Sequence, residues 1–117
     1  MRSASNILGA SAVLLTASAA SAHHGWGHYD AAQVLTLTGT IKAMSYANPH
    51  GTLTLEVPGK TWTVTLAPPF RMQNRGLPAE ALKEGTTVTV VGYPNRTDPI
   101  EMRAERITVS NQTTELR

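Results

Sequence analysis

The chain has 117 residues and no cysteine, with 41% hydrophobic and 15% charged residues. This length predicts a single domain, and the apolar fraction argues against a disordered tail, which combines low hydrophobicity with high net charge. Without cysteine the chain has no disulfide, no thiolate metal site and no cysteine nucleophile. The net charge of +2 is too small an excess to indicate a nucleic-acid partner.

Residues 1–22 have the features of a secretory signal peptide: a basic start, an apolar stretch at 7–15 and the small residues Ala20-Ser21-Ala22. The apolar stretch is too short to span a bilayer, which takes about 20 apolar residues. We expect cleavage between Ala22 and His23. Cleavage after Ala19, or retention of the segment as an anchor helix, are the alternatives. The mature protein, predicted to be periplasmic or secreted, would then have no transmembrane segment.

The predicted mature chain opens with residues 23–33, a segment rich in His, Gly and Trp that has no periodicity. Apolar and polar residues then alternate from Val34, which predicts a strand with a bend or bulge at Gly39. After a loop, the alternation resumes at 52–57 and 60–66 around a Pro-Gly turn. These two segments predict a β-hairpin.

The second half begins where two prolines end the hairpin. Residues 78–84 are helix-prone, with proline in the first turn and Gly85 as the stop, and residues 70–75 can add a short helical turn. Residues 87–93 and 100–109 are predicted strands.

The last of these predicted strands changes phase along its length. Met102 and Ala104 share one parity, whereas Ile107 and Val109 share the other. A β-bulge near Glu105 would reconcile the two halves.

The predicted element order is β-β-β-α-β-β. This is the order of the OB-fold, a five-stranded Greek-key barrel with one short helix, and we assign it to residues 34–110. Closure also removes exposed strand edges. A small open α+β sandwich is the alternative. Residues 111–117 are predicted to form a flexible C-terminal tail.

Several short motifs accompany this pattern. They are His23-His24-Gly25-Trp26, Tyr29-Asp30, Leu37-Thr38-Gly39, Asn48-Pro49-His50, Trp62-Thr63-Val64 and Leu66-Ala67-Pro68-Pro69, followed by Arg71, Arg75 and Gly76-Leu77. In these motifs the chain resembles a family of small exported proteins of Gram-negative bacteria that is known only as a domain of unknown function. The resemblance implies export and an OB-like barrel, and it implies no activity.

Four histidines are candidate metal ligands: His23, His24, His28 and His50. After the predicted cleavage, the free α-amine and the imidazole of His23 could chelate one ion, with a further imidazole from the other three. Such a nitrogen-rich site suits Cu(II), whereas Zn(II) could use three histidines with an open position or Asp30. The alternatives are adventitious metal binding, a structural hydrogen bond for His24 and a turn-capping role for His50.

Aromatic and basic residues suggest a second kind of site. Trp26, Tyr46, Arg71 and Tyr93 could line a ligand groove, although anchoring of the N-terminal segment is the simpler role for Trp26. Trp62 lies on the apolar face of a strand and is predicted to be in the core.

The arginines offer a further possibility. Arg71 and Arg75 are one helical turn apart and could form an anion-binding patch with Arg103 or Arg106. A solvated face is the alternative.

Motifs of common enzymes are missing from the sequence, including Gly-x-Ser-x-Gly, the phosphate loop and His-Glu-x-x-His. We therefore predict a non-catalytic exported binding protein that binds copper or zinc through the N-terminal histidines. The alternative is a metal-independent envelope interaction domain, whose barrel groove binds a peptide, glycan, small molecule or partner protein. No nucleic-acid partner is expected.

Overall fold

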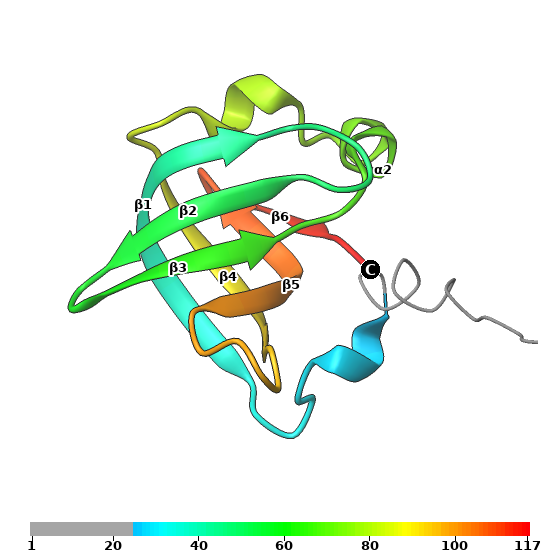
Figure 1. Ribbon diagram of the computed structural model, residues 1–117. Coiled ribbons are helices and arrows are strands. Elements are labelled where there is room, and N and C mark those ends of the chain that lie inside the picture. The colour runs from blue at the N-terminus through cyan, green and yellow to red at the C-terminus, as the bar shows by residue number, and fades with distance from the viewer. Residues whose placement is uncertain (1–24) are drawn as a thin grey trace, which may run out of the picture.

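A computed structural model of the chain describes residues 25–117. The predicted signal peptide, His23 and His24 lie outside this range. The elements in chain order are η1 (Trp26–His28), β1 (Leu35–Ser45), β2 (Thr52–Val57), β3 (Lys60–Thr65), α2 (Pro69–Asn74), η2 (Ala79–Leu82), β4 (Thr87–Pro94), β5 (Glu101–Val109) and β6 (Gln112–Glu115) (Figure 1). No helix among the described residues is long and apolar enough to cross a membrane.

The strands form a closed barrel, which confirms the predicted OB-like fold. Their order is β3-β2-β1-β4-β5-β6, and a parallel pairing of β3 with β5 closes the barrel. The predicted hairpin is present as β2 and β3, and Trp62 is in the core with 9% exposure, as predicted. The core combines inward-facing residues of all five barrel strands with residues of the helical segment and the C-terminal end: Ile41, Leu53, Leu55, Trp62, Val64, Leu66, Ala67, Met72, Leu77, Leu82, Val88, Val90, Met102, Ala104, Ile107 and Leu116.

The long strand β1 pairs with β2 along one half and with β4 along the other. A Cβ atom at Gly39 would collide with the Glu56 carbonyl oxygen, so this glycine permits close approach of the strands. The bulge itself lies at Lys42, where the register with β2 shifts. It reverses the alternation that the sequence suggests, because Ala43 becomes exposed and Met44 packs against the core.

The bulge predicted near Glu105 is confirmed. Val91 pairs with Arg106 and Gly92 pairs with Ala104, which leaves Glu105 as the extra residue of β5. The bulge therefore lets both halves of β5 direct apolar residues into the core.

The helical segment differs from the prediction in the type of its two helices. The α-helix is α2, where only a turn was expected, and the segment expected to be the helix contains the four-residue 3₁₀-helix η2. The backbone becomes extended at Lys83, with ψ of 156°, so η2 ends before a second turn can form.

The prediction of a flexible tail at 111–117 is wrong. Ser110 and Asn111 adopt left-handed backbone conformations, with φ of 50° and 68°, as a two-residue hairpin turn requires. This turn returns the chain as β6, which pairs with the second half of β5. Leu116 then fills a core position with only 2% exposure, and its burial holds the end of the chain in place.

Candidate functional site

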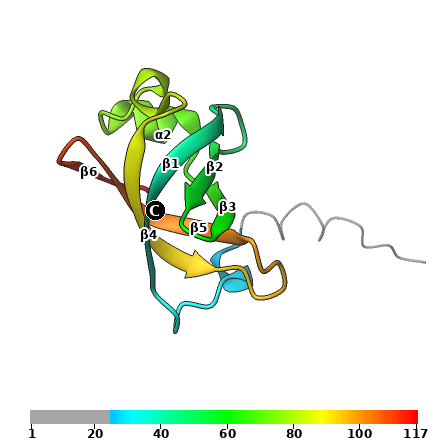
Figure 2. The same cartoon turned by 90° about the vertical axis from the view of Figure 1, so that its left-hand side faces the viewer.

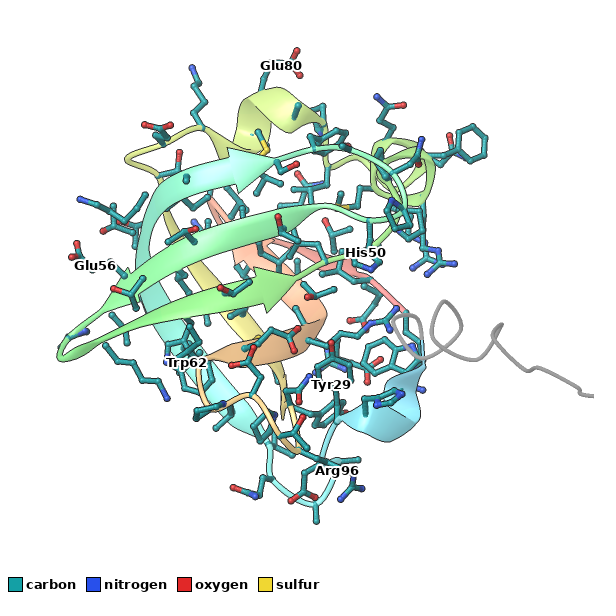
Figure 3. The ribbon with its side chains drawn as sticks, viewed as in Figure 1. Tyr29, His50, Glu56, Trp62, Glu80 and Arg96 are labelled. Carbon is teal, nitrogen blue, oxygen red and sulfur yellow. The ribbon has the colours of Figure 1, made fainter. Side chains whose placement is uncertain are left out.

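Residues Trp26–Asp30, called the N-terminal anchor below, lie against the outside of the barrel, where β4 ends and β5 begins (Figure 1, blue). The anchor has no long regular element of its own, so backbone contacts with the barrel hold it. These contacts are a β-bridge between Tyr29 and Asn95, a hydrogen bond from Asp30 N–H to Pro94 O (2.9 Å) and one from Arg96 N–H to His28 O (2.9 Å). Tyr29 and Arg96 lie at the same end of the barrel in Figure 3. The segment expected to be irregular is therefore docked on the barrel from Trp26 onward.

A buried carboxylate, that of Glu101, binds the anchor through a hydrogen bond from Tyr29. Glu101, at the start of β5, is 9% exposed, and its carboxylate accepts hydrogen bonds from three side chains. Its Oε2 accepts from Tyr29 Oη at 2.8 Å and from Thr65 Oγ1 at 2.6 Å, and its Oε1 accepts from Asn95 Nδ2 at 2.7 Å. Burial, together with the hydrogen bond to Glu101, raises the pKa of Tyr29 to about 12. The phenol thus remains a hydrogen-bond donor throughout the physiological pH range.

Trp26 is held by aromatic and cationic neighbours. Tyr29 and Tyr93 meet its ring edge-on, with centroids 6.4 Å and 6.2 Å away. The guanidinium carbons of Arg103 and Arg117 lie 4.2 Å and 4.0 Å from the ring centroid. These distances are typical of cation–π contacts. Arg103 is 7% exposed, and its burial lowers the pKa of the guanidinium.

Arg117, at the end of the chain, connects Trp26 to β5. Its Nε and Nη2 donate to the two carboxylate oxygens of Glu105 at 3.0 Å and 3.1 Å. Tyr93 Oη also donates to Glu105 Oε1, at 2.9 Å. The hydrogen bond from Arg117 is the main cause that lowers the pKa of Glu105. Glu105, the bulge residue of β5, is therefore ionised at neutral pH and forms a bidentate ion pair with Arg117.

The two described histidines lie in different settings. His28 is exposed at the end of η1. His50, labelled in Figure 3, is partly buried in the loop before β2. The β2–β3 ladder continues to Gly51, whose N–H donates to Ala67 O, so His50 directly precedes the ladder's end.

The register relates His50 to the anchor. Arg103, in contact with Trp26, pairs with Thr65 of β3, which pairs with Thr52 of β2. Adjacent strands are about 4.8 Å apart, so Thr52 is two strand spacings from Arg103, and His50 lies two residues before Thr52 in the chain.

The other predicted ligands can be placed only in part. His23 and His24 lie outside the described residues. Within residues 25–117, no group of three or more His, Cys, Asp or Glu side chains could hold a metal ion. Asp30, the candidate zinc ligand, accepts hydrogen bonds from Ala32 N–H and Gln33 Nε2 within its own turn.

The four residues predicted to line a groove are distributed over two places. Trp26 and Tyr93 are in contact with each other. Tyr46 donates to Leu77 O at 2.6 Å, which ties the end of β1 to the helical segment. Arg71 Nη1 donates to Leu116 O at 3.1 Å.

Of the arginines predicted to form an anion patch, Arg103 contacts Trp26 and the other three bind the C-terminal residues. Arg75 Nη1 donates to the carbonyls of Glu115 (2.8 Å) and Arg117 (3.1 Å), and Arg106 forms an ion pair with Glu115 (2.9 Å). Together with Arg71 they bind the C-terminal strand.

Sequence reasoning missed Glu101 and Arg117, which hold the anchor on the barrel. The sequence did contain a signal for Glu101. Residues 101, 103 and 105 of β5 are all charged, and this alternation places their side chains on the outer face of the strand. No sequence signal indicated Arg117, since its partners are distant in sequence.

A separate groove with a volume of about 310 Å³ lies between η2 and the β5–β6 hairpin, which stands out from the barrel in Figure 2. Leu77, Ala81 and Val109 contribute apolar surface, and Glu80 is its charged lining residue. Among the described residues that line it, none is one of the four predicted groove residues.

The described residues thus define a small OB-like barrel with an N-terminal segment docked across its outer face. The chain belongs to a family of unknown function (DUF6152), whose model matches residues 12–101. This match extends from the predicted signal peptide to the first residue of β5. A comparison with curated proteins finds no match.

Proposed function

We propose that the protein is an exported, non-catalytic binding protein of the periplasm that holds Cu(II) or Zn(II) with its N-terminal histidines. His23 would bind through its α-amine and imidazole, and His24, His28 or His50 would supply further nitrogen. The observation that carries this proposal is the docking of Trp26, because this residue follows His24 by only one glycine.

Docking of Trp26 bears on the proposed ligands. Two residues of extended chain span at most about 7 Å, so in the proposed site His24 would bind the metal beside the docked Trp26. Ligands that are confined before binding lose less conformational entropy on binding the metal. A docked residue next to the histidines is therefore expected of a functional metal site, whereas adventitious metal binding does not require one.

The charges of the anchor are compatible with a divalent cation. Arg103 and Arg117 bring two positive charges to Trp26, and the carboxylates of Glu101 and Glu105 bring two negative ones. The charges of these four side chains around Trp26 therefore cancel. Neutral imidazole and amine nitrogens are the ligands that Cu(II) prefers in tetragonal geometry.

The test uses the processed chain, which mass spectrometry of the periplasmic fraction should show to begin at His23. Calorimetric titration with Cu(II) and Zn(II) should give tight binding, and His23→Ala should weaken it at least about tenfold, equivalent to about 1.4 kcal/mol. His28→Ala and His50→Ala identify which imidazole completes the site. Affinity should fall as pH drops through the histidine range near 6.5, because protonated imidazole is no ligand. Weak binding that is unchanged by His23→Ala and His50→Ala would contradict the proposal.

A metal-independent interaction domain is the second candidate, and the groove beside η2 favours it. A volume of about 310 Å³ is at the lower end of the range for small-molecule sites. Screening short peptides and sugars by NMR against the wild type and Ala81→Trp, whose indole would fill the groove, tests this candidate. Binding that is lost in Ala81→Trp but retained in His23→Ala would favour it over the metal site.

A further inference from the structure

We propose that Arg117 is a positioning residue for the N-terminal histidines: it holds Trp26 in place from the opposite end of the chain and supplies no metal ligand. This inference rests on the proposed metal site. It starts from the contact between the Arg117 guanidinium and the Trp26 ring, at 4.0 Å from the centroid.

Two hydrogen bonds orient the Arg117 side chain. Its guanidinium forms two hydrogen bonds to Glu105, whose position is fixed by the bulge of β5. A fork of this kind restrains both the distance and the plane of the guanidinium. Lysine in the same place would keep the charge but lose the fork.

Hydrogen bonds also hold the backbone of the last three residues, which include Arg117. Leu116 is buried, and its N–H donates to Glu105 O at 2.8 Å. Arg71 and Arg75 of the helical segment bind the carbonyls of the last three residues. The C-terminal strand therefore presents Arg117 to Trp26 as part of the fold, and Figure 1 shows the C-terminus near the N-terminal anchor.

Loss of Arg117 should lower the fraction of molecules in which the N-terminal anchor is docked on the barrel. Apparent affinity falls in proportion to the fraction of molecules in the binding-competent conformation. If Arg117 is removed, Trp26 retains Arg103 and the two tyrosines, and only Tyr93 still joins it to Glu105. The Arg117 side chain is 53% exposed, so we expect Arg117→Ala to weaken Cu(II) binding about two- to fivefold, the range of one exposed cation–π contact, and Arg117→Lys to have a smaller effect. The electron paramagnetic resonance spectrum of the saturated site should not change, because the ligands are the same.

Amide hydrogen exchange of the metal-free protein provides a readout independent of the metal. The amides of Asp30 and Arg96 donate across the boundary between anchor and barrel, so both should exchange faster in Arg117→Ala. Lys42→Ala is the matched control, because Lys42 is a cation of the same sheet with a similarly exposed side chain that pairs with Glu56 of β2. It should leave the exchange of both amides and the affinity unchanged.

Two results separate the claims. If Arg117→Ala leaves exchange and affinity at the wild-type values, or if Lys42→Ala changes them equally, the positioning role is wrong. If the wild type binds no Cu(II) tightly but Arg117→Ala still speeds exchange at Asp30 and Arg96, the metal proposal fails and the hold of Arg117 on the anchor is supported.

Discussion

Replacing Tyr29 with phenylalanine isolates the hydrogen bond that joins the N-terminal anchor to the buried carboxylate of Glu101. The ring and its contact with Trp26 remain, while the donor to Glu101 Oε2 at 2.8 Å is lost. A hydrogen bond to a charged group contributes about 1.5–3 kcal/mol. Since Thr65 and Asn95 continue to donate to Glu101, we expect a loss in this range near neutral pH.

The same contact predicts a specific dependence on alkaline pH. The pKa of Tyr29 is raised from 10.0 to about 12 in the folded protein, so the native state binds the phenolic proton more tightly than the unfolded state. The stability this gives is complete below pH 10 and is lost as pH rises toward 12. A pKa raised this far corresponds to about 3 kcal/mol at 1.36 kcal/mol for each tenfold change.

Urea unfolding of the wild type and Tyr29→Phe at a series of alkaline pH values measures this loss. Tyr46 and Tyr93 titrate in both proteins, so the difference between the two curves reports Tyr29. We expect the stability advantage of the wild type to decline by about 2 kcal/mol between pH 10 and pH 12, with the remainder lost above pH 12. A difference that stays constant through this range would refute the reasoning that Tyr29 is held protonated by burial and Glu101.

Two further predictions concern the fold. Gly92→Ala should destabilise the protein by about 1–3 kcal/mol or more in urea unfolding, because the new Cβ would collide with the Arg103 carbonyl oxygen. Gly27→Ala, whose Cβ would meet nothing within 4 Å, is the control, and equal stability of the two variants would contradict the close strand approach. Leu116→Ala should cost about 2–5 kcal/mol, since this side chain is 2% exposed. The exposed neighbour Gln112→Ala should cost much less, and a loss near zero for Leu116→Ala would mean that the C-terminal strand is not docked.

Local patterns in the sequence predicted much of the barrel. Alternation over 52–66 gave the β2–β3 hairpin, and the change of phase along β5 gave the bulge at Glu105. Both features depend on residues that are close in sequence. The bulge at Lys42 was missed because it depends on where β1 exchanges one partner strand for another, and no local pattern records this exchange.

The contacts of the candidate site could not be predicted in the same way. Trp26 was a candidate for anchoring the N-terminal segment, but its partners Arg103 and Arg117 are more than 70 residues away in the sequence. Residues 111–117 are polar except for Leu116, so composition suggested a flexible tail. One buried leucine and a turn with two left-handed residues were sufficient to form β6.

The most direct test of the proposed function is the Cu(II) affinity of the chain beginning at His23, compared with the same chain carrying an acetylated N-terminus. Acetylation keeps every side chain but removes the α-amine of His23 as a ligand. We predict at least about a tenfold loss of affinity, with a change in the nitrogen hyperfine pattern of the bound Cu(II). Equal affinity and identical spectra for the two chains would contradict a metal site built on the N-terminal histidine.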